Sequence, residues 1–191
     1  MLNGVAHSRF DGEPIDMDVA VNLASTVFLG GLDTLPSNIA WTLRCLADHP
    51  AHRRQLVEDP SVVPAAVEEF FRVFPSVARY GATATRDINF HGVDIKAGDR
   101  VTTVLSLANL DSAVFDHPTE LDFDRTVKRH FAFSAGSHRC LGSHLARHEL
   151  GVFLSEWHAA IPDYRIRPTA KITYTGGAVF ALRNLPLEWD I

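Results

Sequence analysis

The sequence has 191 residues, 46% of them hydrophobic, and a formal net charge of −5 at pH 7. This length allows a substantial core, and the acidic balance argues against a nucleic-acid-binding protein, which usually carries a basic surface. The amino-terminal residues MLNGVAHSRFDGEPID are too polar for a secretory signal, and no uninterrupted apolar run has membrane-spanning length. With only two cysteines, we expect a cytoplasmic protein without a membrane segment.

Apolar residues recur at helical spacing over residues 16–48, which predicts one long helix or two in line. Gly30 and Gly31 each cost about 1 kcal/mol relative to alanine, and Pro36 costs about 3 kcal/mol. A kink near Leu32 is therefore predicted. Further helices are predicted around 52–59, ending at Pro60, and over 64–74.

Residues 82–107 alternate β-branched and polar side chains around two turn signals, which predicts short strands. Residues 110–132 have no clear periodicity and are predicted to form an ordered loop. A helix over 141–159 and a β-hairpin over 172–191 complete the chain. No repeat or linker divides it, so residues 1–191 are expected to form one domain.

The segment FSAGSHRCLG, residues 133–142, places Cys140 directly before the predicted helix 141–159. The positive end of the helix dipole stabilises a thiolate there. Gly136 and Gly142 remove side chains on either side, so a flat partner could approach the backbone. These features favour a metal-bound thiolate beneath a planar cofactor.

Other interpretations of this cysteine stay open on the residues alone. Cys140, His144 and His148 share one helical face at a spacing that can hold zinc. Cys140 and His138 could instead form a nucleophilic pair, or the cysteine could be a buried structural residue. Cys45, on an apolar helical face, is interpreted as structural.

The spacing F-x-x-G-x-H-x-C-x-G resembles the haem-binding loop of the cytochrome P-450 family, the haem-thiolate monooxygenases. It is matched by Phe133, Gly136, His138, Cys140 and Gly142. The segment GGLDT at 30–34 looks like the oxygen-activating part of the family's long helix, and EFFR at 69–72 resembles its E-x-x-R signature. The resemblance is strongest to the bacterial, camphor-hydroxylase-like class, through GGLDT, FHGV, SHRCLGSHLAR and LPLEWD.

The resemblance implies a mainly α fold with small β-sheets (α+β), the carboxyl-terminal, haem-ligating half of the family fold. The amino-terminal half is expected to be absent from this partial domain. The implied function is insertion of one oxygen atom from O2 into a small apolar substrate, with electrons from a redox partner. The alternative is a truncated, catalytically incompetent haem-binding or structural remnant.

The resemblance also implies residue roles. Cys140 would be the axial thiolate ligand of haem b, with Phe133 shielding it. His138 would donate to a haem propionate, helped by Arg139. In the long helix, Gly30 and Gly31 would make room for the cofactor, while Asp33 relays protons and Thr34 donates a hydrogen bond during oxygen activation.

Glu69 and Arg72 lie three residues apart on one helical face, close enough to pair. The resemblance implies that this ion pair is buried and structural. This sequence departs from the family at two positions. Glu120 stands where the family has an arginine that completes this network, with Arg125 as the candidate substitute. The family's propionate-binding arginine falls near Ala82, with Arg79 as its candidate replacement.

Two surfaces are predicted by position. One is a substrate cavity lined by Thr26, Leu29, Val77, Ala78, Ala178 and Val179. The other is a basic cluster around the cysteine loop, formed by Arg125, Lys128, Arg129, Arg139 and Arg147. It is either a solvated basic face or a patch that would dock a ferredoxin-type or other acidic redox donor.

Overall fold

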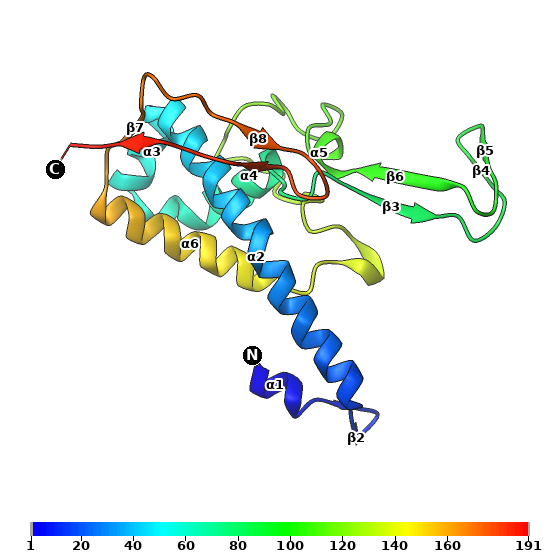
Figure 1. Cartoon of the computed structure of the whole chain (residues 1–191). Coiled ribbons are helices and arrows are strands. Elements are labelled where there is room, and N and C mark those ends of the chain that lie inside the picture. Colours follow the sequence, from blue (N-terminus) through cyan, green and yellow to red (C-terminus); the bar gives the residue numbers. More distant parts are fainter. Residues whose placement is uncertain (1, 191) are drawn as a thin grey trace.

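The computed structural model describes residues 2–190 and is mainly helical, with small two-stranded sheets at its periphery (Figure 1). The fold class predicted from the sequence is confirmed. The helices are α1 (Leu2–Ala6), α2 (Met17–Asp48), α3 (Pro50–Glu58), α4 (Val63–Val73), α5 (Leu105–Ala108) and α6 (Ser143–Ala160), with single 3-10 turns η1 (Pro60–Val62) and η2 (Gly136–His138).

The core lies where α4 and α6 pack against each other and against α3 and the carboxyl-terminal part of α2. Helix α4 buries residues at the i, i+3, i+4, i+7 spacing of an amphipathic helix. Leu46 of α2, Phe70 of α4, and Leu150 and Leu154 of α6 are completely buried. The predicted helices over 52–59, 64–74 and 141–159 are confirmed, although α6 begins at Ser143 rather than Leu141.

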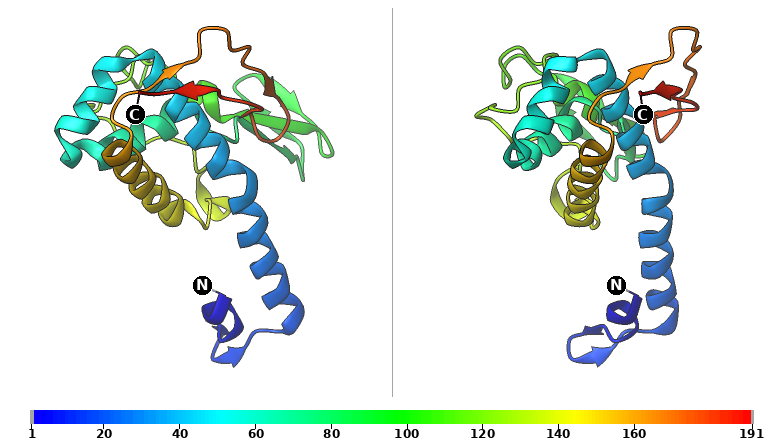
Figure 2. Two further views of the ribbon diagram at one scale, coloured as in Figure 1. Left: turned by 60° about the vertical axis from the view of Figure 1, so that its left-hand side comes forward. Right: turned by 90° about the vertical axis from the view of Figure 1, so that its left-hand side faces the viewer.

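Helix α2 is continuous and contains Pro36 within its length. The kink expected near Leu32 stays a prediction. The amino-terminal half of α2 extends away from the other main helices in both views of Figure 2, and its buried residues all lie between Ser37 and Leu46. Its buried contacts are therefore confined to its carboxyl-terminal half.

By length and composition alone, α2 could cross a membrane. An 18-residue window has a mean hydropathy of 1.3, and none of it is buried. Core helices of globular proteins can have the same length and composition. The hydropathy of α2 nevertheless qualifies the expectation, drawn from the lack of an uninterrupted apolar run, that the sequence holds no such segment.

The strands form antiparallel pairs: β1 (Arg9–Phe10) with β2 (Glu13–Pro14), β3 (Arg79–Thr83) with β6 (Arg100–Val104), β4 (Ile88–Phe90) with β5 (Val93–Ile95), β7 (Arg165–Ile166) with β10 (Leu187–Glu188), and β8 (Tyr174–Thr175) with β9 (Ala181–Leu182). The β4–β5 hairpin turns at His91 and Gly92, both with positive φ, as expected of a tight two-residue turn. The strands predicted within 82–107 and the loop predicted over 110–132 are confirmed, while β3 starts earlier and α5 was not predicted.

The single hairpin predicted over 172–191 is wrong in part. Within residues 172–191, β8 and β9 form a hairpin. Strand β10 pairs instead with β7, in the register Leu187 with Ile166 and Glu188 with Arg165. The Arg165 side chain also donates to Glu188 at 2.8 Å. Alternation along a sequence indicates a strand but does not identify its partner.

Candidate functional site

The cysteine loop, residues 133–142, is closed by a backbone hydrogen bond from the N–H of Cys140 to the carbonyl of Phe133, at 2.9 Å. Ser134 and Gly136 have φ of 59° and 69°, so the chain turns sharply before η2. Gly142 occupies the N-cap of α6. Cys140 therefore lies just ahead of the helix and is exposed.

The backbone around this thiol is open. A Cβ added at Gly136 would meet no atom within 4 Å, and one at Gly142 would meet only the Cys140 sulfur, at 3.9 Å. Leu141, beside the cysteine, is 72% exposed, so the thiol has an apolar neighbour facing outward. An accessible thiol, an apolar surface and free backbone are what a planar, iron-bearing macrocycle requires, so these residues fit a haem.

The segment at 30–34 lies on α2. Gly30 and Gly31 are exposed, and a Cβ at either would meet nothing within 4 Å. The hydroxyl of Thr34 donates to the carbonyl of Gly30, at 2.5 Å. The hydroxyl of Ser76 donates to the carbonyl of Thr34, at 2.6 Å, and so ties the segment after α4 to α2 at this point.

A groove of about 530 Å³ runs between α2 and the β8–β9 hairpin. Leu32, Asp33 and Pro36 line it from α2, and Ala178 and Val179 line it from the hairpin turn. The hairpin is held to α2 because Ser37 and Trp41 both donate to the carbonyl of Phe180, at 2.7 and 3.0 Å. The structure thus brings Asp33 together with two of the predicted substrate residues.

The other predicted substrate residues do not line this groove. Thr26 lies about 10 Å along the helix axis from Asp33 and donates to the carbonyl of Asn22. Leu29 is 64% exposed on α2. Val77 and Ala78 lead into β3, where the Ala78 carbonyl accepts from the N–H of Ser106. Position along a sequence could not show which of these segments face one another.

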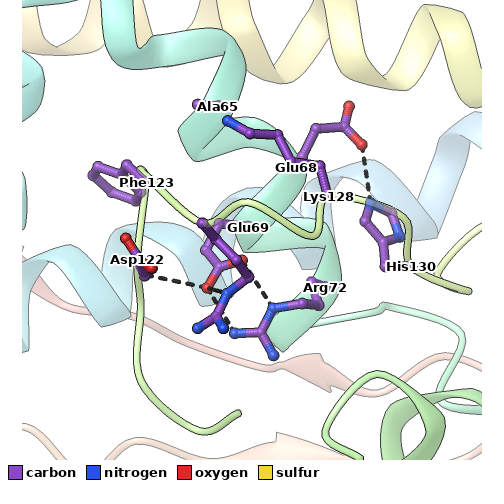
Figure 3. A pocket seen from close by; sticks show the side chains of 9 residues that line it. Ala65, Glu68, Glu69, Arg72, Asp122, Phe123, Lys128 and His130 are labelled. Atoms are coloured by element: carbon purple, nitrogen blue, oxygen red, sulfur yellow. Dashed lines mark hydrogen bonds and ion pairs between the residues drawn. The ribbon is translucent and has the colours of Figure 1, made fainter. Parts of the chain in front are cut away.

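The predicted ion pair between Glu69 and Arg72 is present and buried, with side-chain exposures of 5% and 1% (Figure 3). Arg72 donates to both carboxylate oxygens, at 2.8 and 2.6 Å, and Arg125 donates to the same carboxylate at 3.0 Å. Burial alone would raise the pKa of Glu69, but Arg72 and Arg125 outweigh it and lower the pKa. Arg125 thus occupies the third position of the network, and Glu120 contributes only its backbone carbonyl.

This network has a structural rather than a catalytic geometry. The pocket beside it, shown in Figure 3, has room for about 10 Å³, which is only enough for a single water molecule. Arg72 also donates to the carbonyls of Asn109 and Pro118. The pair therefore fixes the long loop against α4.

The predicted basic patch is wrong in two of its members. The Arg125 side chain is only 8% exposed and pairs with Glu69. Arg147 pairs with Glu68. Acidic residues of α4 attract both guanidinium groups inward, so only Lys128, Arg129 and Arg139 remain exposed.

The alternatives for Cys140 receive no support from the geometry. Within residues 2–190, no group of three or more potential ligands is arranged to hold a metal ion, which argues against the zinc site with His144 and His148. Nor does a hydrogen bond join His138 to Cys140 in the part of the chain that the structure describes. Cys45 is buried as predicted, and burial raises the pKa of its thiol to about 12.

Two further residues around this site were not predicted. Asn109 is fully buried, and its side-chain oxygen accepts from the N–H of Phe131, at 2.7 Å. Glu68, next to Glu69, binds His130 and Arg147. A second glutamate beside the E-x-x-R signature was the only signal for the latter in the sequence.

The comparisons with known proteins agree with this geometry. Residues 4–157 match the family model described as Cytochrome P450. Probable cytochrome P450 127A1 of Sinorhizobium fredii is 36% identical over 97% of this chain, and Cytochrome P450 105A3 of Streptomyces carbophilus is 38% identical over 97%. The crystal structure of Cytochrome P450 CYP101C1 superposes with a TM-score of 0.94, at 37% identity over 100% of this chain.

Fold, cysteine loop and comparisons therefore point to the same class of protein. The chain belongs to the cytochrome P450 family. It spans about half the length of the relatives it matches, covering 44% and 46% of the two curated proteins and 48% of the crystallised one.

Proposed function

We propose that this chain forms the haem-ligating part of a monooxygenase that inserts one oxygen atom of O2 into a C–H bond of a small apolar substrate. The observation that carries the proposal is the exposed Cys140 thiol on an open, glycine-flanked loop in a chain of this family. A ferredoxin-type or other redox donor would supply electrons. The reaction would take place in the cytoplasm.

Haem, when bound, supplies the oxygen activation. Cys140 would hold the haem iron through its thiolate, and thiolate ligation favours O–O cleavage. His138 and Arg139, both exposed, would pair with the propionates. Arg79, exposed at the start of β3, would take the place of the arginine missing near Ala82.

Residues of α2 would transfer protons and would line the substrate groove together with the β8–β9 turn. Asp33 lines the groove and would carry protons from solvent toward Thr34. The Thr34 hydroxyl, which donates to the carbonyl of Gly30, would be the last hydrogen-bond donor of this proton path. Ala178 and Val179 would contact the substrate, and the groove volume of about 530 Å³ suits a small organic molecule.

The chain leaves uncovered a surface that a complete site would bury. Met17, Phe28, Leu29 and Leu32 of α2 are between 51% and 74% exposed, and large apolar surfaces of this kind mark interaction sites. Every residue of β3 and β6 is exposed, and an isolated two-stranded sheet is only marginally stable in water. We infer that the amino-terminal half of a P450 fold covers this surface and that the chain by itself binds haem weakly and turns over poorly.

The reduced, carbon-monoxide-bound absorption spectrum tests the proposal. We expect a thiolate-type Soret band when the chain is combined with an amino-terminal P450 half, a weak one from the chain alone, and loss of the band in Cys140→Ser. Cys45→Ser is the matched control and retains the band. Absence of the band in every combination would favour the alternative, a remnant without catalytic competence. A full band with steady turnover from the chain alone would contradict the need for a second half.

The redox donor would dock on Lys128, Arg129 and Arg139, the exposed members of the predicted patch. Complementary charge steers such encounters, and salt screens it. We expect the rate of reduction by an acidic ferredoxin to fall as ionic strength rises. A rate independent of salt would argue against this surface.

A further inference from the structure

Glu68 of α4 binds two side chains that lie on opposite sides of the cysteine loop in the sequence. Arg147 of α6 donates to both carboxylate oxygens, at 2.5 and 3.0 Å. His130, which precedes the loop, contacts the same carboxylate through Nε2, at 3.0 Å (Figure 3). One carboxylate thus joins α4 to the chain before and after residues 133–142.

The orientation of His130 is fixed by its second nitrogen. The N–H of Ala132 donates to His130 Nδ1, at 3.2 Å, so Nδ1 is an acceptor and Nε2 carries the proton given to Glu68. The His130 side chain is only 2% exposed. Burial alone would raise the pKa of Glu68, but hydrogen bonds from His130 and Arg147 outweigh it and lower the pKa to about 2. The carboxylate is therefore ionised at neutral pH, as both donors require.

Arg147 and His130 converge on Phe133, the first residue of the cysteine loop. The Arg147 guanidinium lies over the Phe133 ring, 4.5 Å from its centroid, and the His130 ring centroid is 5.9 Å away. Phe71 of α4 packs on the same ring, at 4.7 Å. Phe133 in turn accepts the backbone hydrogen bond of Cys140. A continuous series of contacts therefore leads from Glu68 to the backbone of the cysteine.

We propose that Glu68 is a positioning residue that holds Cys140 in place by fixing both ends of the cysteine loop to α4. Its neighbour Glu69 has a different task, since its carboxylate holds Arg72, Arg125 and the N–H of Asp122 in the preceding long loop. Two adjacent glutamates thus anchor two successive segments. That the positioned thiol then ligates iron rests on the proposed function.

Hydrogen exchange of the haem-free full chain tests the positioning directly. In Glu68→Gln the neutral side-chain amide presents an N–H group toward His130 and Arg147, which are themselves donors. The charge-assisted hydrogen bonds of these two residues to the carboxylate are therefore lost. We expect the Cys140 amide to exchange about tenfold faster and its thiol to react faster with a thiol reagent. Glu120→Gln, which replaces an exposed carboxylate of the long loop, is the matched control and should change neither rate.

A second pair of variants separates positioning from general stability. Leu154→Ala weakens the core without touching the loop, so it should lower the melting temperature and speed the exchange of core amides. The Cys140 amide, which opens with the loop, should keep its rate. Arg147→Lys keeps the charge but loses the bidentate contact with Glu68, so its Cys140 amide should exchange at an intermediate rate. This variant also tests the proposal if Glu68→Gln does not fold. Equal exchange in Glu68→Gln and Glu120→Gln, or in Arg147→Lys and the parent chain, would overturn the proposal.

The same variants distinguish this proposal from the proposed function. A faster Cys140 amide in Glu68→Gln, in a chain that yields no thiolate-type haem spectrum with any partner half, would retain the positioning role and reject iron ligation. Where the spectrum does form, we expect Glu68→Gln to reduce the thiolate-type fraction, with Glu120→Gln unchanged.

Discussion

Replacement of Arg125 by methionine removes the guanidinium group, the third member of the Glu69 network, and keeps an unbranched apolar stem. Arg125 Nε donates to Glu69, at 3.0 Å, and Nη1 donates to the carbonyl of Asp116, at 2.6 Å. Its side chain is only 8% exposed, and that of Glu69 is 5% exposed. Neither group can turn to bulk water without a rearrangement of the loop.

The size of the effect follows from what remains. Removal of one partner from a buried ion pair costs about 3–5 kcal/mol when the remaining charge is left alone. Here Glu69 keeps both contacts from Arg72, which places the cost at the lower end. The carbonyls released by Arg125 can hydrate, because the long loop lies at the surface. We expect a loss of about 3 kcal/mol in the free energy of unfolding.

Urea denaturation of the full chain, followed by far-ultraviolet circular dichroism, measures this loss. Arg129→Met is the matched control, since Arg129 is a neighbouring arginine of the same loop and is exposed. Surface substitutions of this kind usually change the free energy of unfolding by less than about 0.5 kcal/mol. Equal midpoints and slopes for the two variants would refute the assignment of Arg125 as the residue that substitutes for the family's arginine.

Three further outcomes are expected. The pKa of Glu68 is lowered to about 2 in the folded chain, so its contribution to stability is present above the unfolded pKa of about 4.3 and is lost as pH falls toward 2. Glu68→Gln should remove roughly 1–3 kcal/mol of this pH dependence of the free energy of unfolding. An unchanged slope of stability against pH would contradict the ion-pair geometry. A thiol reagent should modify Cys140 rapidly in the native chain and Cys45 only after unfolding, since the Cys45 thiol is buried with a pKa raised to about 12; two fast thiols by mass spectrometry would be inconsistent with this packing. Leu154→Ala should cost about 2–5 kcal/mol, because Leu154 is completely buried, whereas Val152→Ala on the exposed side of α6 should cost little; equal costs would show that α6 is not packed as described.

The sequence by itself determined the family and the principal helices. The cysteine loop, with its glycines and histidine, is a local pattern. Each of its residue types can be explained from the chemistry of the loop itself, without knowledge of distant contacts. Helices α4 and α6 were predictable because their apolar spacing is set by the helical repeat. Cys45 was correctly assigned to the core for the same reason.

Only the tertiary structure decided which charged residues are free. Arg125 and Arg147 look like members of a basic surface in the sequence, yet each pairs with a glutamate of α4. Likewise, only the folded chain brings Asp33 beside Ala178 and Val179 and pairs β10 with β7. Ion pairs, grooves and strand partners depend on which segments meet in space, and residues far apart in sequence carry no local signal of that meeting.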